Sequence, residues 1–279
     1  MNIFKKLISE ENILVEQTLN NLQFETVNTK INAYLLNLCF FHRDTKIRNV
    51  ARKKIFEFGL NNLILQTEAN WQKDTLKEQK YYQKELYENP LVDASEFITI
   101  GQVTRKNYFL KYKKSKFLAL AHMRYDDDIE NIFDCYQVPL EKLSDNLKIL
   151  KHITVANFHG QTKLNFDEVV QILSTLPNIK FLQIAKSNLG KLPSNLDDLK
   201  SLKRLIIEYN PIDSLGNYKS ELLERLEVKG TKINEIDLNN FPNLKELWVD
   251  DSNSKNRINI KNKNGTLKIT SGAMYSEVI

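Results

Sequence analysis

The sequence predicts an α+β protein in which a helical N-terminal part precedes a curved parallel β-sheet built from short, repeated strands. Three observations predict this fold class. Apolar residues recur at helical spacing from Ile31 to Phe58. A strand-like pattern recurs at a nearly constant interval in the second half of the chain. The composition, 42% apolar and 27% charged over 279 residues, is that of a folded protein rather than a disordered chain.

Helices account for the first part of the chain. An apolar stripe from Ile31 to Leu38 predicts one helix. Asp44 is a suitable cap for the next helix, which carries its apolar residues on one side and ends at Gly59. A more polar helix is expected around Trp71. We therefore expect a helical N-terminal domain over residues 1–95.

One of these helices has a family resemblance. The motif Asp44-x-x-Ile47-Arg48-x-x-Ala51 resembles the second helix of a HEAT-type repeat, and the resemblance extends over one unit, residues 44–59. A plain helical bundle is the alternative, and it requires no family.

A mixed strand and linker segment is expected over residues 96–145. Three stretches have strand composition: 97–101, 108–112 and 117–120. The run Asp126-Asp127-Asp128 marks a loop. Together with the helices, this segment is expected to cover the open apolar end of the repeated sheet, which cannot be left in contact with water.

The repeat becomes visible when apolar positions are aligned by spacing rather than by identity. Four copies share the pattern apolar-x-x-apolar-x-apolar-x-x-polar, and they begin at Ile179, Leu202, Leu223 and Leu244. The second apolar position of these copies is always leucine, at Leu182, Leu205, Leu226 and Leu247. Four copies in phase at a nearly constant interval are a specific signal of a repeat architecture.

This pattern resembles the strand motif L-x-x-L-x-L-x-x-N of the leucine-rich-repeat family, over about residues 145–275. The segment from Leu192 to Ile212 follows the motif almost throughout. The resemblance implies a leucine-rich-repeat solenoid with a C-terminal cap over residues 146–279. Its apolar residues would point inward and stack between adjacent copies.

The last position of the motif calls for a short polar side chain that satisfies backbone groups where the chain leaves the strand. Asn210 offers both a donor and an acceptor for this role. Ser187, Thr231 and Ser252 occupy the same position in the other copies and can fill it in part.

The first copy of the repeat is irregular. Aligning Ile153 with Leu182 makes the first step longer than all later ones and places Phe158 at the polar position. A helix that starts at Asn165 and ends at Pro177 explains the extra length.

Further strands are possible at both ends of the repeat. Phe133-x-Cys135 precedes Ile153-x-Val155 by one repeat interval, so the sheet begins either there or at the first copy. Leu267-x-Ile269 follows Leu247 by a similar interval, with Leu267 opposite Leu247, and is a candidate last strand.

Residues between the inward-pointing positions of each strand must face the other side of the sheet, because side chains alternate along a strand. In the first copy this places His152 and Thr154 on the concave face. The candidate partner-binding residues on this face are Phe181, Gln183, Arg204, Ile206, Tyr209, Arg225, Glu227, Trp248 and Asp250. Aromatic residues and arginine are typical of binding hot spots, so the face predicts a protein-binding surface. For Trp248, coverage by the C-terminal cap is the alternative.

Catalytic and metal-binding motifs are absent from the sequence. It contains no H-E-x-x-H, C-x-x-C, G-x-S-x-G or P-loop pattern. We assign no catalytic, metal or cofactor role to the histidines, which are His42, His122, His152 and His159. Cys39 and Cys135 are expected to be buried, reduced thiols. The chain is therefore predicted not to be an enzyme.

The low net charge of the chain argues against nucleic acid as a partner. Forty basic against 35 acidic residues leave a net charge of +5, far from the excess of a phosphate-binding surface. One local exception, Arg105 to Lys116, interleaves basic residues with aromatic ones. This segment fits either single-stranded nucleic acid or a hairpin with lysines along its edge, and we favour the hairpin.

The sequence therefore predicts a non-enzymatic protein–protein interaction module that binds a protein partner on its concave face. Nucleic-acid binding through residues 105–116 is the alternative. The longest apolar run, Tyr34 to Phe41, is too short for a membrane span, so we expect a monomeric, cytoplasmic protein with no membrane contact.

Overall fold

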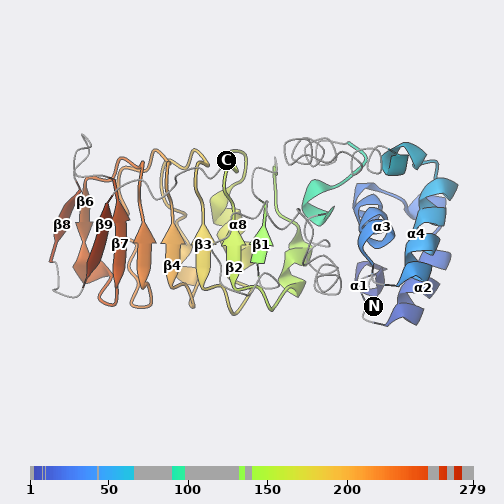
Figure 1. Cartoon of the computed structure of the whole chain (residues 1–279), viewed down its shortest axis with the longest axis horizontal. Helices are drawn as coiled ribbons and strands as arrows, with labels where there is room; N and C mark the ends of the chain where they lie inside the picture. The colour runs from blue at the N-terminus through green and yellow to red at the C-terminus, as the bar shows by residue number, and fades with distance from the viewer. Residues whose placement is uncertain are drawn as a thin grey trace. The chain divides into compact units, whose positions relative to one another are not determined.

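The computed structural model describes residues 3–7, 9, 11–42, 44–65, 90–97, 132–135, 140–250, 258–262 and 267–271. The chain divides into two units, Met1–Glu130 and Asn131–Ile279. The described part of the first unit is helical and that of the second contains a parallel sheet (Figure 1). The predicted mixture of helices and parallel strands is therefore confirmed.

The described helices of the first unit include α1 (Ile3–Leu7), α2 (Asn12–Asn20), the 3-10 turn η1 (Phe24–Thr26), α3 (Thr29–Phe41) and α4 (Thr45–Glu57). The last two contain the stretches for which the sequence predicted particular helices, the apolar stripe from Ile31 to Leu38 and the helix capped by Asp44. The Asp44 carboxylate accepts a hydrogen bond of 2.8 Å from the Lys46 N–H and so caps α4, as predicted. Gly59 follows α4 with a left-handed φ of 69°, which a glycine adopts without strain.

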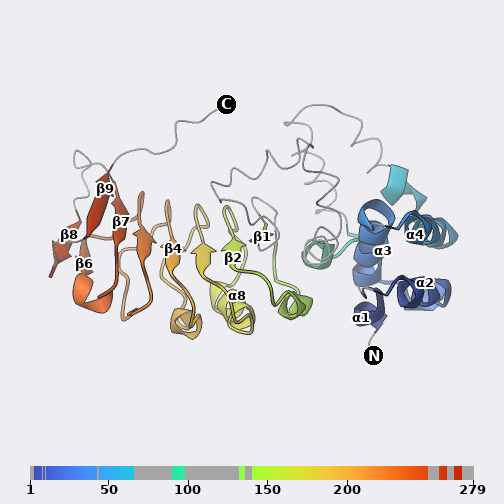
Figure 2. The same ribbon diagram turned by 60° about the horizontal axis from the view of Figure 1, so that its bottom comes forward.

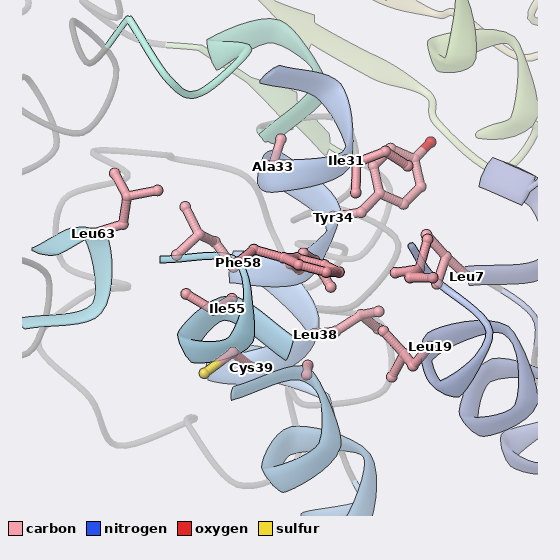
Figure 3. Packing of buried hydrophobic residues seen from close by; sticks show 14 of the residues in the cluster. Leu7, Leu19, Ile31, Ala33, Tyr34, Leu38, Cys39, Ile55, Phe58 and Leu63 are labelled. Atoms are coloured by element: carbon pink, nitrogen blue, oxygen red, sulfur yellow. The ribbon is translucent and has the colours of Figure 1, made fainter. Parts of the chain in front are cut away.

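The core of this unit lies between the helices. The predicted stripe on α3 is confirmed, since Ile31, Tyr34, Leu35 and Leu38 are at most 1% exposed. Figure 3 shows several of these side chains packed against Leu7, Leu19 and Ile55 from the other helices. Burial of this apolar area is the main force that holds α1–α4 together.

Two asparagines of α3 attach the segment 90–97 to the helices. The Nδ2 atoms of Asn32 and Asn37 donate hydrogen bonds of 2.8 and 2.9 Å to the carbonyls of Leu91 and Phe97. Phe97 is helical, as are residues 94–96, so the strand expected to begin there is wrong for this residue. The remainder of the strand-like stretches and the helix around Trp71 lie outside the described residues.

The second unit contains a seven-stranded sheet in the order β1-β2-β3-β4-β5-β7-β9, and every neighbouring pair is parallel. Its strands are β1 (Ile132–Asp134), β2 (Val155–Asn157), β3 (Phe181–Gln183), β4 (Arg204–Ile206), β5 (Arg225–Glu227), β7 (Glu246–Val249) and β9 (Lys268–Ser271). A second, two-stranded parallel sheet pairs β6 (Glu235–Asp237) with β8 (Asn259–Lys261).

The repeat spacing sets the register of the central strands. Leu182, Leu205, Leu226 and Leu247 are direct neighbours across β3, β4, β5 and β7. Each of the four is fully buried. The prediction that these leucines point inward and stack between copies is confirmed.

The alignment of the first copy is wrong. Ala156, not Ile153, pairs with Leu182, so the first step is shorter than expected. The polar position then falls on Gln161 instead of Phe158. Gln161 is 1% exposed, and its Nε2 donates to the Cys135 carbonyl at 2.6 Å. A longer amide thus replaces asparagine in this copy.

The sheet extends beyond the first copy at one end and beyond Leu247 at the other. Phe133 lies in β1, so the sheet does begin one strand earlier, although Phe133 pairs with Ala156 and not with Ile153 as the alignment expected. The last strand is also present, but Ile269 rather than Leu267 pairs with Leu247.

The segments between strands differ in length as predicted. The first return carries α8 (Phe166–Leu173), whose apolar face is buried and whose cap, Asn165, accepts from the Asp167 N–H. This helix ends before Pro177. In the described parts of the other connections, the helical elements are the short 3-10 turns η4 (Asp145–Ile149), η5 (Leu196–Asp198) and η6 (Leu238–Asn240). Figure 2 shows α8 and these turns along the same side of the strands.

The predicted role of Asn210 is confirmed. Its Oδ1 accepts from the N–H groups of Ser187 and Leu189 at 2.9 and 3.0 Å, and its Nδ2 donates to the Ile207 carbonyl at 3.1 Å. The Oγ of Ser187 donates to the Phe158 carbonyl, and that of Thr231 to the Val228 carbonyl. Ser252 lies outside the described residues.

Candidate functional site

One face of the seven-stranded sheet carries two rows of side chains that point away from the buried leucines; we call it the charged face. Strand pairing places Phe181, Arg204, Arg225 and Glu246 in one row, and Gln183, Ile206, Glu227 and Trp248 in the next. The residues predicted for these two rows in β3 to β7 are therefore neighbours in the structure.

The first copy contributes different residues to this face. Because Ala156 pairs with Leu182, the two rows continue through Val155 and Asn157 of β2. The expected positions of His152 and Thr154 in these rows are wrong, since both residues precede the strand.

An ion-pair network crosses three strands of the charged face. The Nε and Nη2 of Arg204 donate to Oε1 of Glu227 at 3.0 and 2.6 Å, and the Nε of Arg225 donates to the same oxygen at 2.9 Å. The Nη1 of Arg225 lies 3.1 Å from Oε2 of Glu246. Trp248 donates its Nε1–H to that Glu246 oxygen at 3.3 Å. Glu227 is only 3% exposed, so two guanidinium groups compensate its buried charge.

Three apolar residues of the charged face are buried. This corrects the expectation of exposure for Phe181 and Ile206, whereas for Trp248 both exposure and coverage were alternatives. Phe181, Ile206 and Trp248 are 6%, 2% and 6% exposed. The guanidinium carbon of Arg204 lies 4.4 Å from the ring centroid of Phe181, and that of Arg225 lies 4.3 Å from that of Trp248. The rings therefore support the charged groups of neighbouring strands.

Tyr209 is the exposed aromatic residue of this surface, with 48% of its surface accessible. It follows β4 at the point where the chain leaves the strand, and its φ is 54°. Backbone hydrogen bonds align Tyr209 with Lys186 in the preceding copy and with Gly230 in the following one. The Lys186 ammonium lies 5.3 Å from the centroid of the Tyr209 ring.

Asp250 lies beside this exposed tyrosine. Its two carboxylate oxygens accept from the Gly230 N–H at 2.9 and 3.1 Å. Burial, together with the negative charges of Glu208 and Asp250, raises the pKa of the Tyr209 hydroxyl. These contacts place the predicted residues Tyr209 and Asp250 at the same edge of the charged face.

The carboxyl of Glu208 is a further feature of this face that was not among the candidate binding residues. Glu208 is 3% exposed, and its Oε1 has no hydrogen-bond partner among the described residues. Burial and the nearby Glu227 carboxylate raise the pKa of Glu208 to about 7, although Lys229, Arg204 and Arg225 oppose the shift. Alternation continued past the end of β4 predicts Glu208 on this face, whereas its burial depends on neighbouring side chains.

Several candidate features lie elsewhere. The basic segment 105–116, the run Asp126-Asp127-Asp128 and His122 are outside the described residues. Burial and the charge of Lys186 lower the pKa of His159 to about 4, so this histidine is neutral at physiological pH. Over the ranges given above, no three His, Cys, Asp or Glu side chains converge to hold a metal ion.

A cleft of about 370 Å³ lies near β6, lined in part by Leu215 and Phe241. Its two carboxylates are paired: Glu235 with Lys261 at 2.7 Å, and Asp237 with Asn262 Nδ2 at 2.7 Å. We assign no ligand to this cleft.

Outside the sheet, Cys39 and Cys135 are both buried, as predicted. No described helix has the length and apolar character required to cross a membrane. No protein-family model matches this sequence, and no curated protein matches it.

Proposed function

We propose that this protein is a non-enzymatic interaction module whose second unit is a leucine-rich-repeat solenoid that binds a protein partner on the charged face. The sequence motif in four copies and the parallel register of β3, β4, β5 and β7 support the family assignment. In a solenoid of this kind, the residues that vary between copies line one extended surface. The residues of the charged face vary in this way while the leucines behind them do not.

The exposure and backbone conformation of Tyr209 carry this proposal. Four equivalent positions, Gly160, Lys186, Tyr209 and Gly230, all have left-handed φ values. A residue other than glycine is strained in this conformation, and local strain accumulates at functional sites. Tyrosine is also enriched in binding hot spots. An exposed tyrosine at a position where two other copies have glycine therefore supports a role in binding.

The charge of the face supports a protein partner. Lys186, Arg204, Arg225 and Lys229 are interspersed with Glu208, Glu227, Glu246 and Asp250. Mixed charges around an aromatic residue favour an oriented protein partner over a uniform polyanion. The two cysteines of the chain, both buried and too few for a disulfide framework, support the further proposal of a cytoplasmic location.

The function is tested with two matched surface variants. Tyr209 and Leu222 are exposed to 48% and 50% and both lie in the second unit, but Leu222 is not part of the charged face. A partner is captured from a lysate of the source cells with the immobilised full chain, identified and purified. Its affinity is then measured by calorimetry for the unmodified chain, Tyr209→Ala and Leu222→Ala.

We expect Tyr209→Ala to weaken binding by about tenfold or more, the range of a hot-spot tyrosine, and Leu222→Ala to leave it unchanged. Equal affinities for all three proteins would show that the charged face is not the binding surface.

A further inference from the structure

The paired arginines of the charged face are held in fixed orientations. Arg204 and Arg225 are opposite one another on adjacent strands, β4 and β5, so their backbones are about 4.8 Å apart across the sheet. Each guanidinium stacks on an aromatic ring, Phe181 or Trp248, and both are hydrogen-bonded to the buried Glu227. Such groups lose little freedom when a ligand binds.

The same arginines remain accessible and retain donors. Their side chains are 28% and 25% exposed. A guanidinium has five N–H donors. Arg204 uses its Nε and one Nη2 proton on Glu227, while Arg225 engages Glu227 through Nε and Glu246 through Nη1. Each therefore keeps N–H groups that no acceptor in the described part of the chain takes up.

The local charge is positive where the arginines lie. On the segments of β3 to β5 that form the charged face and its edge, four cations, Lys186, Arg204, Arg225 and Lys229, outnumber Glu208 and Glu227, and they still exceed the carboxylates by one when Glu246 of β7, the ion-pair partner of Arg225, is included. Glu227 is buried beneath the arginines, so it lowers their charge without blocking their outer sides. This half of the face therefore attracts an anion.

We infer that Arg204 and Arg225 form a carboxylate-binding subsite, and that the partner presents an acidic peptide segment to it. Two stacked guanidinium groups offer the planar, forked donors that match a carboxylate. Single-stranded nucleic acid would also require open aromatic rings for base stacking, but the rings of Phe181 and Trp248 are buried under cations. The inference names the partner chemistry of the proposed function and rests on it.

The probe for this subsite is a hexaglutamate peptide, titrated into the full chain at low salt. Binding is measured by calorimetry and located by the NMR signals of the arginine Nε–H and tryptophan Nε1–H groups. We expect saturable binding that shifts the signals of Arg204, Arg225 and Trp248. An oligothymidylate of equal charge, titrated separately, reports whether phosphates are preferred.

The variants take account of the buried carboxylate. Removing both arginines would leave Glu227 buried and unpaired, so the test protein carries Arg204→Gln, Arg225→Gln and Glu227→Gln together. We expect hexaglutamate affinity to fall about tenfold or more, since charge-assisted hydrogen bonds are lost. Glu227→Gln alone keeps both arginines and releases their donors, so it should bind the probe at least as tightly as the unmodified chain.

Two further variants separate geometry from charge. Lys203→Gln with Lys245→Gln removes two exposed cations that pair with Glu224, and it should leave binding unchanged. Arg204→Lys with Arg225→Lys keeps the charge but loses the planar, forked N–H donors of the guanidinium groups, and this variant should bind hexaglutamate as weakly as the triple variant. Retention of melting temperature in every variant shows that the fold is preserved.

Four outcomes would overturn the inference: no binding of hexaglutamate, full binding by the triple variant, full binding by the double lysine variant, or tighter binding of oligothymidylate through the same arginines. Failure of this inference can be distinguished from failure of the proposed function. If an identified partner is weakened by Tyr209→Ala but not by the triple variant, the charged face is an interface and only the acidic chemistry is wrong.

Discussion

The ring of Tyr209 lies directly against the backbone of Gly230 in the following copy. A Cβ atom added to Gly230 would come within 2.4 Å of Cδ1 of Tyr209, closer than carbon atoms can approach. Gly230 also has a φ of 65°, which disfavours any other residue. The exposed tyrosine therefore depends on a glycine one strand away for its position.

Gly230→Ala is expected to destabilise the second unit by about 1–3 kcal/mol, because it combines backbone strain with displacement of the Tyr209 ring. Urea unfolding measures this change. Gly190→Ala is the matched control, since nothing lies within 4 Å of a Cβ there. Adding Tyr209→Ala to Gly230→Ala should restore the part of the unfolding free energy that is lost through the collision with the Tyr209 ring. A double variant no more stable than Gly230→Ala would show that this collision contributes nothing.

Asn210→Ala is expected to cost about 3 kcal/mol or more. The substitution removes the acceptor of the Ser187 and Leu189 N–H groups, and each buried group left without a partner costs about 1–3 kcal/mol. The free energy of unfolding in urea tests this, with Asn217→Ala at an exposed turn as the control. Equal stabilities of the two variants would show that the Asn210 hydrogen bonds contribute little.

The regular copies of the repeat could be predicted from spacing alone. Leu205, Leu226 and Leu247 are buried because each strand repeats the same inward positions, and their register follows from the step between them. The first copy departs from the apolar pattern, so aligning Ile153 was wrong. The glycine at position 160 indicates the correct alignment, because Gly160 directly precedes the polar position at Gln161 just as Gly230 precedes Thr231.

Alternation along the strands predicted which residues share the charged face, but not which of them are exposed. The burial of Phe181 and Trp248 results from long arginine and lysine side chains of neighbouring strands that lie over the rings. Spacing does not encode this, because the same side chains could extend into water. Tyr209 alone among the predicted large apolar residues is exposed.

Trp248 and Tyr209 should therefore respond differently to truncation. Trp248→Ala removes a ring that is 6% exposed and supports Arg225 and Lys229, so it is expected to cost about 3–5 kcal/mol. Tyr209→Ala removes a half-exposed ring and should cost about 1 kcal/mol or less. Thermal unfolding of both variants gives the comparison. A Trp248→Ala protein as stable as the unmodified chain would mean that the ring is not a packing element.

The last prediction concerns pH and the buried carboxyl of Glu208. Burial and the Glu227 charge raise the pKa of Glu208 to about 7 in the folded protein, while a glutamate in an unfolded chain titrates near 4.3. Between these values the folded state holds a proton that the unfolded state has lost. The free energy of unfolding therefore decreases as pH rises through this window, by on the order of 3 kcal/mol.

Glu208→Gln stays uncharged at every pH, so it should remove most of this decrease. Urea unfolding at pH 5 and pH 8 tests the prediction in both proteins. Glu224→Gln is the contrasting control. Hydrogen bonds from Lys203 and Lys245 lower the pKa of Glu224 to about 2, so the contribution of Glu224 to the free energy of unfolding is lost only in acid and is constant between pH 5 and 8. If Glu208→Gln and the unmodified chain lose the same stability over this range, Glu208 is ionised throughout, and the cations around it outweigh its burial.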